Sequence, residues 1–194
     1  MQDDHYRNYS NRLQAVLEQQ DWQPVDQLGR DLQVIWANKR RVFLCGNGGS
    51  AANAIHIAND FMYGASCEEK TGLNVHALPA NQAVLTCLAN DLSYEDVYSH
   101  QISVFGRQKD LLIVLSGSGN SPNILRALEQ AKVVGLKSYA ILGYSGGKAL
   151  EMADVAIHFP IDDMQIAEDC QLVVGHMLMR WLVKNGKGQA AVET

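Results

Sequence analysis

The stretch VFLCGNGGSAANAIHIANDF, residues 42–61, decides how this chain folds. It opens with the apolar run Val42–Cys45, continues through a loop of glycine, asparagine and serine, and ends in a helical pattern over Ala51–Phe61. A strand, a glycine-rich loop and a helix in this order form the repeating unit of a parallel sheet covered by helices. The same unit returns at residues 111–134, LLIVLSGSGNSPNILRALEQAKVV.

Short apolar runs of this kind alternate with helical patterns along the chain. The runs are nearly continuous in apolar residues, as strands buried on both faces require. We therefore expect the α/β class, with three α-β-α layers around a five-stranded parallel sheet. The predicted strands are Val42–Cys45, Leu73–Leu78, Leu111–Leu115, Ser138–Leu142 and Val155–Phe159.

Helical patterns flank this core at both ends. Amphipathic patterns over residues 4–20 and 24–39 predict two helices before the first strand, and Met164–Val183 predicts a long final helix. No linker or low-complexity segment divides the chain. We expect one domain over residues 1–194, with an N-terminal helical segment at 1–40 and an α/β core at 41–185.

The composition is that of a globular protein, with 47% hydrophobic and 19% charged residues. A net charge of -5 without a Lys/Arg run argues against direct binding of nucleic acid or anionic lipid. Neither a membrane span of roughly 18 apolar residues nor a secretion signal is evident. Cys45, Cys67, Cys87 and Cys170 form no C-x-x-C pair. We therefore expect a cytoplasmic protein with no membrane contact.

The two Gly/Ser loops have the features of phosphate sites. Glycine lets the backbone approach an anion, serine hydroxyls donate to its oxygens, and the start of a helix favours negative charge. Ser121 and Pro122 suit the N-cap and first position of a helix. The candidate phosphate and substrate residues are Asn47, Gly48, Gly49, Ser50, Ser116, Gly117, Ser118 and Ser121.

A plainer interpretation is that glycine and serine only form tight turns here. A dinucleotide site is disfavoured because Ala51 and Pro122 stand where the last glycine of G-x-G-x-x-G would come. A nucleoside triphosphate P-loop motif is absent from the sequence. The recurrence of the loop after two strands favours a phosphorylated ligand.

Histidines and carboxylates on two predicted helices are candidates for the chemistry. His56 and Asp60 are four residues apart and share a helix face, and Glu168 and His176 are eight apart on the last helix. Together they suit either a Zn²⁺ site or an acid/base pair, although a pair such as His56 and Asp60 is often only a solvated surface pair. Asp91 either accepts a hydrogen bond from a sugar hydroxyl or caps the start of the following helix.

Four segments of the chain resemble the sugar isomerase (SIS) domain of the phosphoheptose isomerase group, and the resemblance covers about residues 5–183. The segments are GNGGSAANAIHIANDF (46–61), LANDLSYEDVYSHQI (88–102), VLSGSGNSPNILRALEQAKVVG (114–135) and MQIAEDCQLVVGHM (164–177). The resemblance implies a homotetramer with active sites between subunits. It also implies conversion of sedoheptulose 7-phosphate into D-glycero-D-manno-heptose 7-phosphate.

By the same resemblance, the serines of both loops bind phosphate and Asp91 contacts the sugar. His56, Asp60, Glu168 and His176 fall on the family's metal and acid/base positions, which implies a Zn²⁺ cofactor. An isomerase built on them would work through an enediol, with Asp60 or Glu168 as base and His176 as acid.

The chain departs from the family pattern at three of these positions. The family commonly has Glu in place of Asp60, Gln in place of Glu168 and Thr in place of Gly117. Two other functions stay open: a non-catalytic adaptor of the same fold that binds a replication initiator, and a sugar-phosphate sensor. An isomerase of another sugar phosphate is a further alternative.

Overall fold

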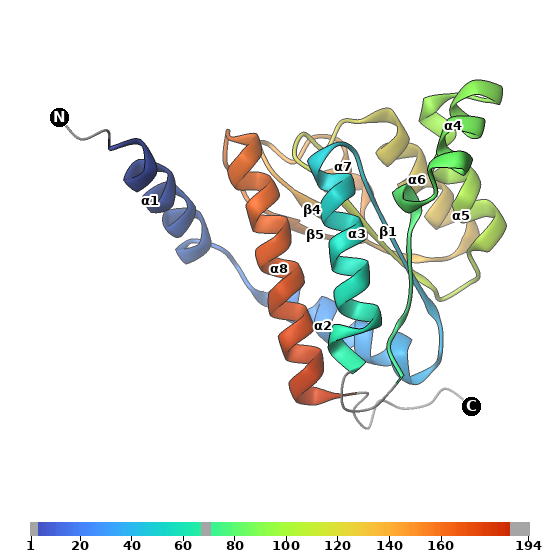
Figure 1. The fold of residues 1–194 in the computed structure, drawn as a ribbon, viewed down its shortest axis with the longest axis horizontal. Coiled ribbons are helices and arrows are strands. Elements are labelled where there is room, and N and C mark those ends of the chain that lie inside the picture. The colour runs from blue at the N-terminus through green and yellow to red at the C-terminus, as the bar shows by residue number, and fades with distance from the viewer. Residues whose placement is uncertain (1–3, 67–70, 187–194) are drawn as a thin grey trace.

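A five-stranded, entirely parallel sheet forms the centre of the computed structural model, which describes residues 4–66 and 71–186 (Figure 1). The strand order is β2-β1-β3-β4-β5. Every predicted strand is confirmed, with bounds that differ by one residue at most. The strands are β1 (Arg41–Gly46), β2 (Asn74–Ala77), β3 (Leu111–Ser116), β4 (Lys137–Leu142) and β5 (Val155–His158).

Helices cover both faces of the sheet, which confirms the three-layer α/β class. One face packs on α2 (Gln23–Ala37), α3 (Gly49–Met62) and α8 (Met164–Asn185). The other face packs on α4 (Gln82–Asp91), α5 (Ser99–Phe105), α6 (Pro122–Val134) and α7 (Ala149–Met152). Three 3-10 turns complete the described elements: η1 (Gly64–Ser66), η2 (Leu78–Ala80) and η3 (Tyr94–Asp96).

The strand side chains point alternately into two cores. On β1, Val42 and Leu44 join the core beneath α2, α3 and α8, whereas Phe43 and Cys45 join the core beneath α4 to α7. All four are 0% exposed. Because both faces are covered, the strand must be apolar at every position, and this explains the continuous runs in the sequence.

The helices α3 and α8 lie side by side in Figure 1, and both begin at the edge of the sheet where the strands end. The two helices approach closely at Gly175, where an added Cβ would come within 2.6 Å of Cγ1 of Ile57. The carboxylate of Asp163 caps α8 by accepting hydrogen bonds from the backbone N–H groups of Gln165 and Ile166. The candidate site lies between these two helices.

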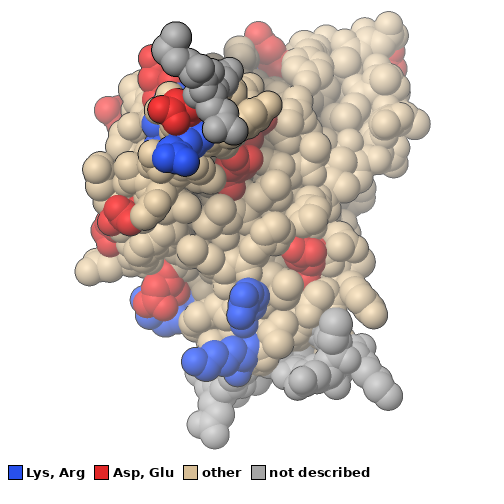
Figure 2. Space-filling model, turned by 60° about the vertical axis from the view of Figure 1, so that its left-hand side comes forward, with Lys and Arg blue, Asp and Glu red and all other residues tan. Residues whose placement is uncertain are grey.

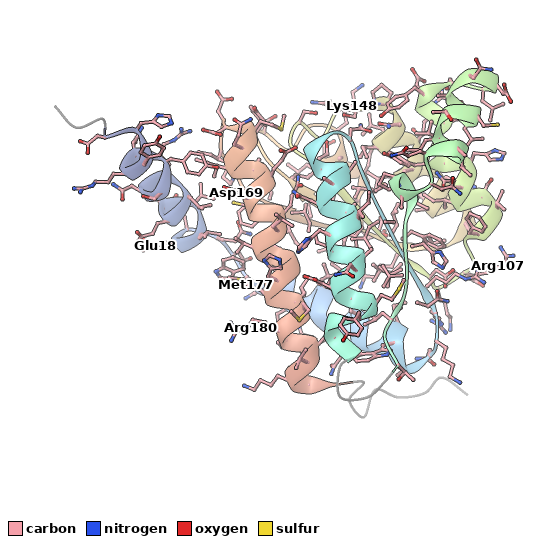
Figure 3. All side chains as sticks on the ribbon, viewed as in Figure 1. Glu18, Arg107, Lys148, Asp169, Met177 and Arg180 are labelled. Carbon is pink, nitrogen blue, oxygen red and sulfur yellow. The ribbon has the colours of Figure 1, made fainter. Side chains whose placement is uncertain are left out.

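The helix α1 (His5–Glu18) extends away from the domain in Figure 1. Two polar contacts join it to the start of α8. The Tyr9 hydroxyl donates to Asp169 at 2.6 Å, and the Arg12 guanidinium pairs with Asp163 at 2.8 Å. Figure 3 shows Asp169 on the side of α8 that faces α1.

The charged side chains are scattered over the face of the molecule that Figure 2 shows. On the face shown in Figure 2, Lys and Arg stand singly or in small groups and form no broad basic area among the described residues. None of the helices in the described part of the chain is long and apolar enough to cross a membrane. Of the four cysteines, Cys67 lies outside the described residues, and the other three are free thiols.

The segment between β2 and β3 differs from the sequence prediction. Helices α4 and α5 were not predicted, because their patterns are short, with ten and seven residues. Asp91 is the last residue of α4 and not the cap of a following helix, and Ser93 is the residue that precedes η3. That capping interpretation is therefore wrong.

Candidate active site

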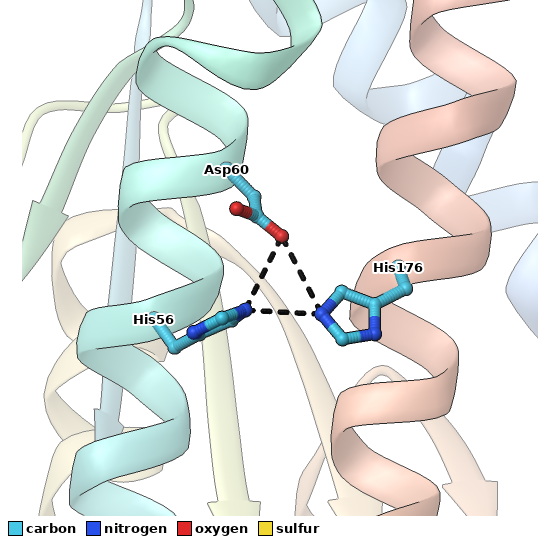
Figure 4. A group of neighbouring side chains, drawn as sticks. All are labelled: His56, Asp60 and His176. Atoms are coloured by element: carbon cyan, nitrogen blue, oxygen red, sulfur yellow. Dashed lines mark hydrogen bonds and ion pairs between the residues drawn. The ribbon is translucent and has the colours of Figure 1, made fainter.

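Three side chains from two helices meet between α3 and α8 (Figure 4). The Nε2 atoms of His56 and His176 are 3.0 Å apart. Oδ2 of Asp60 lies 3.5 Å from the His56 nitrogen and 3.6 Å from the His176 nitrogen. The imidazoles are about half exposed, whereas the Asp60 side chain is only 16% exposed. The cluster is thus open to solvent on the imidazole side and backed by the carboxylate.

The geometry of this cluster fits a Zn²⁺ ion. Three ligands at the usual Zn–N and Zn–O bond lengths of a tetrahedral site lie about 3.3 Å from one another. The separations of 3.0, 3.5 and 3.6 Å surround this value. All three ligand atoms lie within 4.8 Å of one another, and each residue has a nitrogen or oxygen lone pair to offer.

Glu168 does not join this cluster, although the sequence placed it among the metal ligands. Eight residues of helix advance about 12 Å, so the side chains of Glu168 and His176 leave α8 at different levels. The Glu168 carboxylate lies instead at the start of α3. There, a Cβ added to Gly49 would come within 2.3 Å of its Oε2 atom. The described residues therefore bring together three of the four expected ligands.

A chain of buried polar side chains leads to Glu168. The Asn53 amide donates to Gln171 at 3.0 Å, and the Gln171 amide donates to the Ser50 hydroxyl at 3.1 Å. The Ser50 hydroxyl in turn reaches Oε1 of Glu168 at 3.5 Å. Gln171 is 1% exposed and Ser50 is 4% exposed. These donors fix the carboxylate and occupy the hydroxyl that the sequence had offered to a phosphate.

The loop after β3 has a different environment. Ser116 is buried, and its hydroxyl oxygen accepts the Gly119 backbone N–H at 3.0 Å. Ser121 is the N-cap residue of α6 and Pro122 is its first residue, as predicted. The Ser121 side chain makes no capping hydrogen bond. Unlike the first loop, this loop forms no hydrogen bond to a carboxylate within the described part of the chain, so an anion meets no hydrogen-bonded like charge there.

The loop after β4 packs closely on this second loop. The Lys148 backbone N–H donates to the Asn120 side chain at 3.0 Å, and the Ala149 N–H donates to the Gly119 carbonyl at 3.0 Å. A Cβ on Gly119 would come within 1.9 Å of the Gly146 carbonyl oxygen. Figure 3 shows Lys148 at the edge of the molecule where α3 begins. Glycine is therefore needed where the two loops touch.

Gly117, which departs from the family pattern, is explained by its neighbour. A Cβ at this position would come within 2.5 Å of Sδ of Met164, the first residue of α8. The thioether thus fills the space that a Thr side chain would take. In this chain the second loop is bounded by a sulfur atom and not by a hydroxyl group.

Asp91 lies apart from the other candidates. Its side chain is exposed at the end of α4 and accepts hydrogen bonds from Asn90 at 2.7 Å and from the Cys87 thiol at 3.4 Å. These two hydrogen bonds, that of Asn90 first, lower the pKa of Asp91. Within the described residues it bonds to neither Gly/Ser loop, so its contact with a sugar stays a prediction.

Several buried amides of the site were missed from the sequence. Asn53 shares the buried face of α3 with Ile57, and Gln171 shares that of α8 with Val174. Asn123 is 2% exposed on the apolar face of α6. An amide that interrupts an apolar helix face is a readable signal, because a buried polar group needs hydrogen-bond partners.

Comparison with known proteins places this chain in a family. The SIS domain model matches residues 5–143. A phosphoheptose isomerase from Chlorobaculum parvum is 36% identical over 188 residues, which cover 94% of this chain and 88% of the relative. The fold resembles the phosphoheptose isomerase structures from Francisella tularensis (TM-score 0.87, 24% identity, covering 93% of this chain and 96% of that one) and Neisseria gonorrhoeae (0.83, 26%, 93% and 95%). The chain belongs to the SIS domain family, in its phosphoheptose isomerase group.

Proposed function

We propose that this protein is an aldose-ketose isomerase that converts sedoheptulose 7-phosphate into D-glycero-D-manno-heptose 7-phosphate through an enediol. The substrate is taken from the names of the relatives that are 36–38% identical. The observation that carries the proposal is the meeting of His56, Asp60 and His176 between α3 and α8. A solvated surface pair of His56 and Asp60 would not need a third polar side chain, that of His176, from a helix 120 residues away from His56 in the sequence.

We assign a Zn²⁺ ion to these three side chains. Two imidazole nitrogens and one carboxylate would hold the ion, and catalytic zinc sites commonly have three protein ligands of these kinds. When bound, Zn²⁺ supplies a Lewis acid that polarises the sugar carbonyl. Asp60 lies against both imidazoles, so Glu168 is the carboxylate left to move protons.

The two Gly/Ser loops divide the substrate between them in this proposal. The phosphate binds the loop after β3, through Ser116, Gly117, Ser118 and Ser121. The first loop, with Asn47, Gly48, Gly49 and Ser50, faces the sugar and the Glu168 carboxylate. A phosphate at the first loop would meet the negative charge of Glu168 at short range, which is unfavourable in a partly buried site.

The reaction then needs two proton transfers at neighbouring carbons. Glu168 takes a proton from C1 of the ketose while the carbonyl oxygen on C2 gains one, which gives the enediol. The oxygen on C1 then loses its proton and C2 accepts one, which leaves an aldehyde at C1. We propose that His176 faces the sugar oxygens and contributes an acid function or a metal bond there.

We further propose that the chain acts as a single domain in a homotetramer in the cytoplasm. The family resemblance supports the assembly, and the absence of a spanning helix among the described residues agrees with the location. Among the described residues Asp91 hydrogen-bonds to its neighbours Asn90 and Cys87 and to neither loop, so a role in sugar binding fits a site completed by a neighbouring subunit.

The experiment is isomerisation in D₂O. Purified protein is stripped of metal and incubated with sedoheptulose 7-phosphate, with and without one equivalent of Zn²⁺, while NMR follows aldoheptose formation and deuterium at C1 and C2. We expect turnover with zinc, and its loss in His176→Ala. His100→Ala, an exposed histidine outside the cluster, is the matched control. Neither product nor deuterium exchange in the wild type would refute the isomerase and favour the adaptor function.

A further inference from the structure

Two asparagines join the Gly/Ser loops directly. The Asn47 side-chain N–H donates to Oδ1 of Asn123 at 2.8 Å, and the Asn123 side-chain N–H donates to Oδ1 of Asn47 at 2.8 Å. Asn47 belongs to the loop after β1, and Asn123 is the second residue of α6. The result is a closed amide pair in which each side chain both donates and accepts.

The surroundings hold this pair in one orientation. Asn123 is buried, and the Asn47 oxygen also accepts the Tyr94 hydroxyl at 3.1 Å and lies 3.5 Å from the Tyr98 hydroxyl. The Tyr98 hydroxyl donates to the Gly46 carbonyl. The Asn123 amide and the Tyr94 hydroxyl both donate to the Asn47 oxygen, so rotation of the Asn47 amide would place its N–H group against an N–H and an O–H group. The pair is therefore fixed by both partners and by η3.

We infer that Asn123 is a positioning residue, which through Asn47 sets the distance between the phosphate held at the start of α6 and the sugar carbons held at the first loop. The inference rests on the proposed function, because it assigns those two parts of the substrate to those two loops. Asn123 itself touches neither reacting carbon. It contributes by holding the two loops at a fixed distance from one another.

The expected effect follows from what proton transfer needs. A base acts only within hydrogen-bond reach of its proton, and a displacement of about 1 Å can lower a rate about 100-fold. If the two loops move apart, the phosphate still binds at the loop after β3, but C1 no longer lies opposite Glu168. Loss of the pair should therefore lower kcat and leave KM within about threefold.

Asn123→Asp tests the inference through pH, because the introduced carboxyl group can be ionised or protonated. An ionised carboxylate accepts the Asn47 N–H but faces the Asn47 oxygen with a second acceptor, whereas a protonated carboxyl group donates to that oxygen and restores the pair. Because position 123 is buried, the pKa of the introduced carboxyl group is raised above its ordinary value. We therefore expect kcat relative to wild type to be about 100-fold lower at pH 8 and to recover at least tenfold at pH 5.5. Asn123→Ala should be equally slow at both pH values.

The titratable groups beside the pair include a buried tyrosine and a buried cysteine. Burial raises the pKa of the Tyr98 hydroxyl and of the Cys45 thiol, so both stay protonated. Arg126, one turn further along α6, stays paired with Glu95 and Asp96. A recovery confined to Asn123→Asp is therefore due to the introduced carboxyl group.

Gln101→Glu is the matched control for simple loss of stability. Gln101 is a buried amide on α5 that donates to two backbone carbonyls, and it contacts neither loop. We expect this variant to melt at a lower temperature with the kcat of wild type at both pH values. A loss confined to KM in Asn123→Asp, or an equal fall of kcat in Gln101→Glu, would overturn the inference.

A second measurement separates this inference from the isomerase proposal. Inorganic phosphate is added to the ¹⁵N-labelled protein, and the amide signals of Gly49 and Gly119 are followed by NMR. In wild type both signals should shift with one Kd, because the loops are joined, whereas in Asn123→Ala only Gly119 should shift. If both still shift in Asn123→Ala, the inference is wrong, even where the wild type is an active isomerase. If the wild type lacks turnover but shows this difference, only the isomerase proposal fails.

Discussion

Two carboxylates near the candidate active site differ in what surrounds them. Asp60 lies beside two imidazoles. The Glu168 carboxylate lies at the start of α3 and accepts a hydrogen bond from the Ser50 hydroxyl. Groups with such different partners carry different tasks. We therefore expect Asp60 to serve the metal and Glu168 to serve as the base.

Replacement of each carboxylate by its amide separates these tasks. Glu168→Gln should bind zinc as wild type does and lose isomerisation by at least about 100-fold, the low end of general-base effects. Asp60→Asn should lose zinc as well as activity. Zinc content by mass spectrometry and turnover by NMR measure the two properties. A Glu168→Gln variant that keeps full activity would return the base function to Asp60.

The contact between Gly117 and Met164 can be tested by changing both residues. Gly117→Thr places a side chain where the Met164 sulfur lies, and because this sulfur belongs to a flexible, exposed side chain that can move aside, the cost is about 1 kcal/mol, the low end for overpacking. We expect Gly117→Thr to lower both the melting temperature and the phosphate affinity. Gly117→Thr combined with Met164→Ala should regain most of both, which a double-mutant cycle by calorimetry would measure. Strict additivity of the two changes would contradict the steric account.

At the residue scale, the side chains with reactive groups could be predicted from the sequence, but the buried amides that hydrogen-bond around them could not. His56, Asp60 and His176 were predicted to act together, and the structure brings them together. Glu168 was wrongly expected to join them, because a shared helix face says nothing about the level along the helix. Asn123 and Gln171 were missed, because their partners come from distant parts of the chain.

Among the elements, the contact of α3 with α8 controls the candidate metal site. The helices approach closely at Gly175, next to His176 in sequence. Gly175→Ala should push α8 from Ile57, destabilise the fold by about 1–3 kcal/mol and weaken zinc binding at least tenfold. Chemical denaturation and zinc titration would check this. Gly29→Ala, against the Trp181 ring on the other side of α8, is the control and should keep zinc affinity.

The attachment of α1 should depend on pH. Burial, followed by the hydrogen bond to Asp169, raises the pKa of Tyr9 to about 12 from an ordinary value of 10.0. A pKa raised on folding means stability that is complete below pH 10 and lost as the pH rises through about 12. We expect wild type to melt above Tyr9→Phe at pH 8, with the difference gone near pH 12. Circular dichroism would follow it, and a constant difference would refute the linkage.

Elements with long, regular patterns were predictable, and short ones were not. The helix Pro122–Val134 was predicted with its observed bounds, because Ser121, Pro122 and Gly135 mark both ends. The helices α4 and α5 were missed: only Leu88 is buried on α4, and α5 has seven residues. Their positions are set by packing on the sheet and not by local pattern.

For the molecule as a whole, the homotetramer is the main expectation still to be measured. Large apolar side chains such as Val104, Phe105 and Met62 are exposed in the single chain, at 51%, 47% and 53%. Exposed apolar groups of this kind are typical of surfaces that other subunits cover. We expect light scattering after size exclusion to give four times the monomer mass. A monomer at micromolar concentration would contradict the assembly and leave Asp91 without a substrate role.

The placement of the His56, Asp60 and His176 cluster across two helices has a consequence for how long the protein survives in a cell. An ion that binds the folded chain and not the unfolded one adds stability that grows with its free concentration. Bound zinc would therefore link α3 to α8. When zinc is scarce, the two helices would separate more often, and proteases could cleave the opened chain. Scarcity of the metal would remove the enzyme itself, and not only its activity.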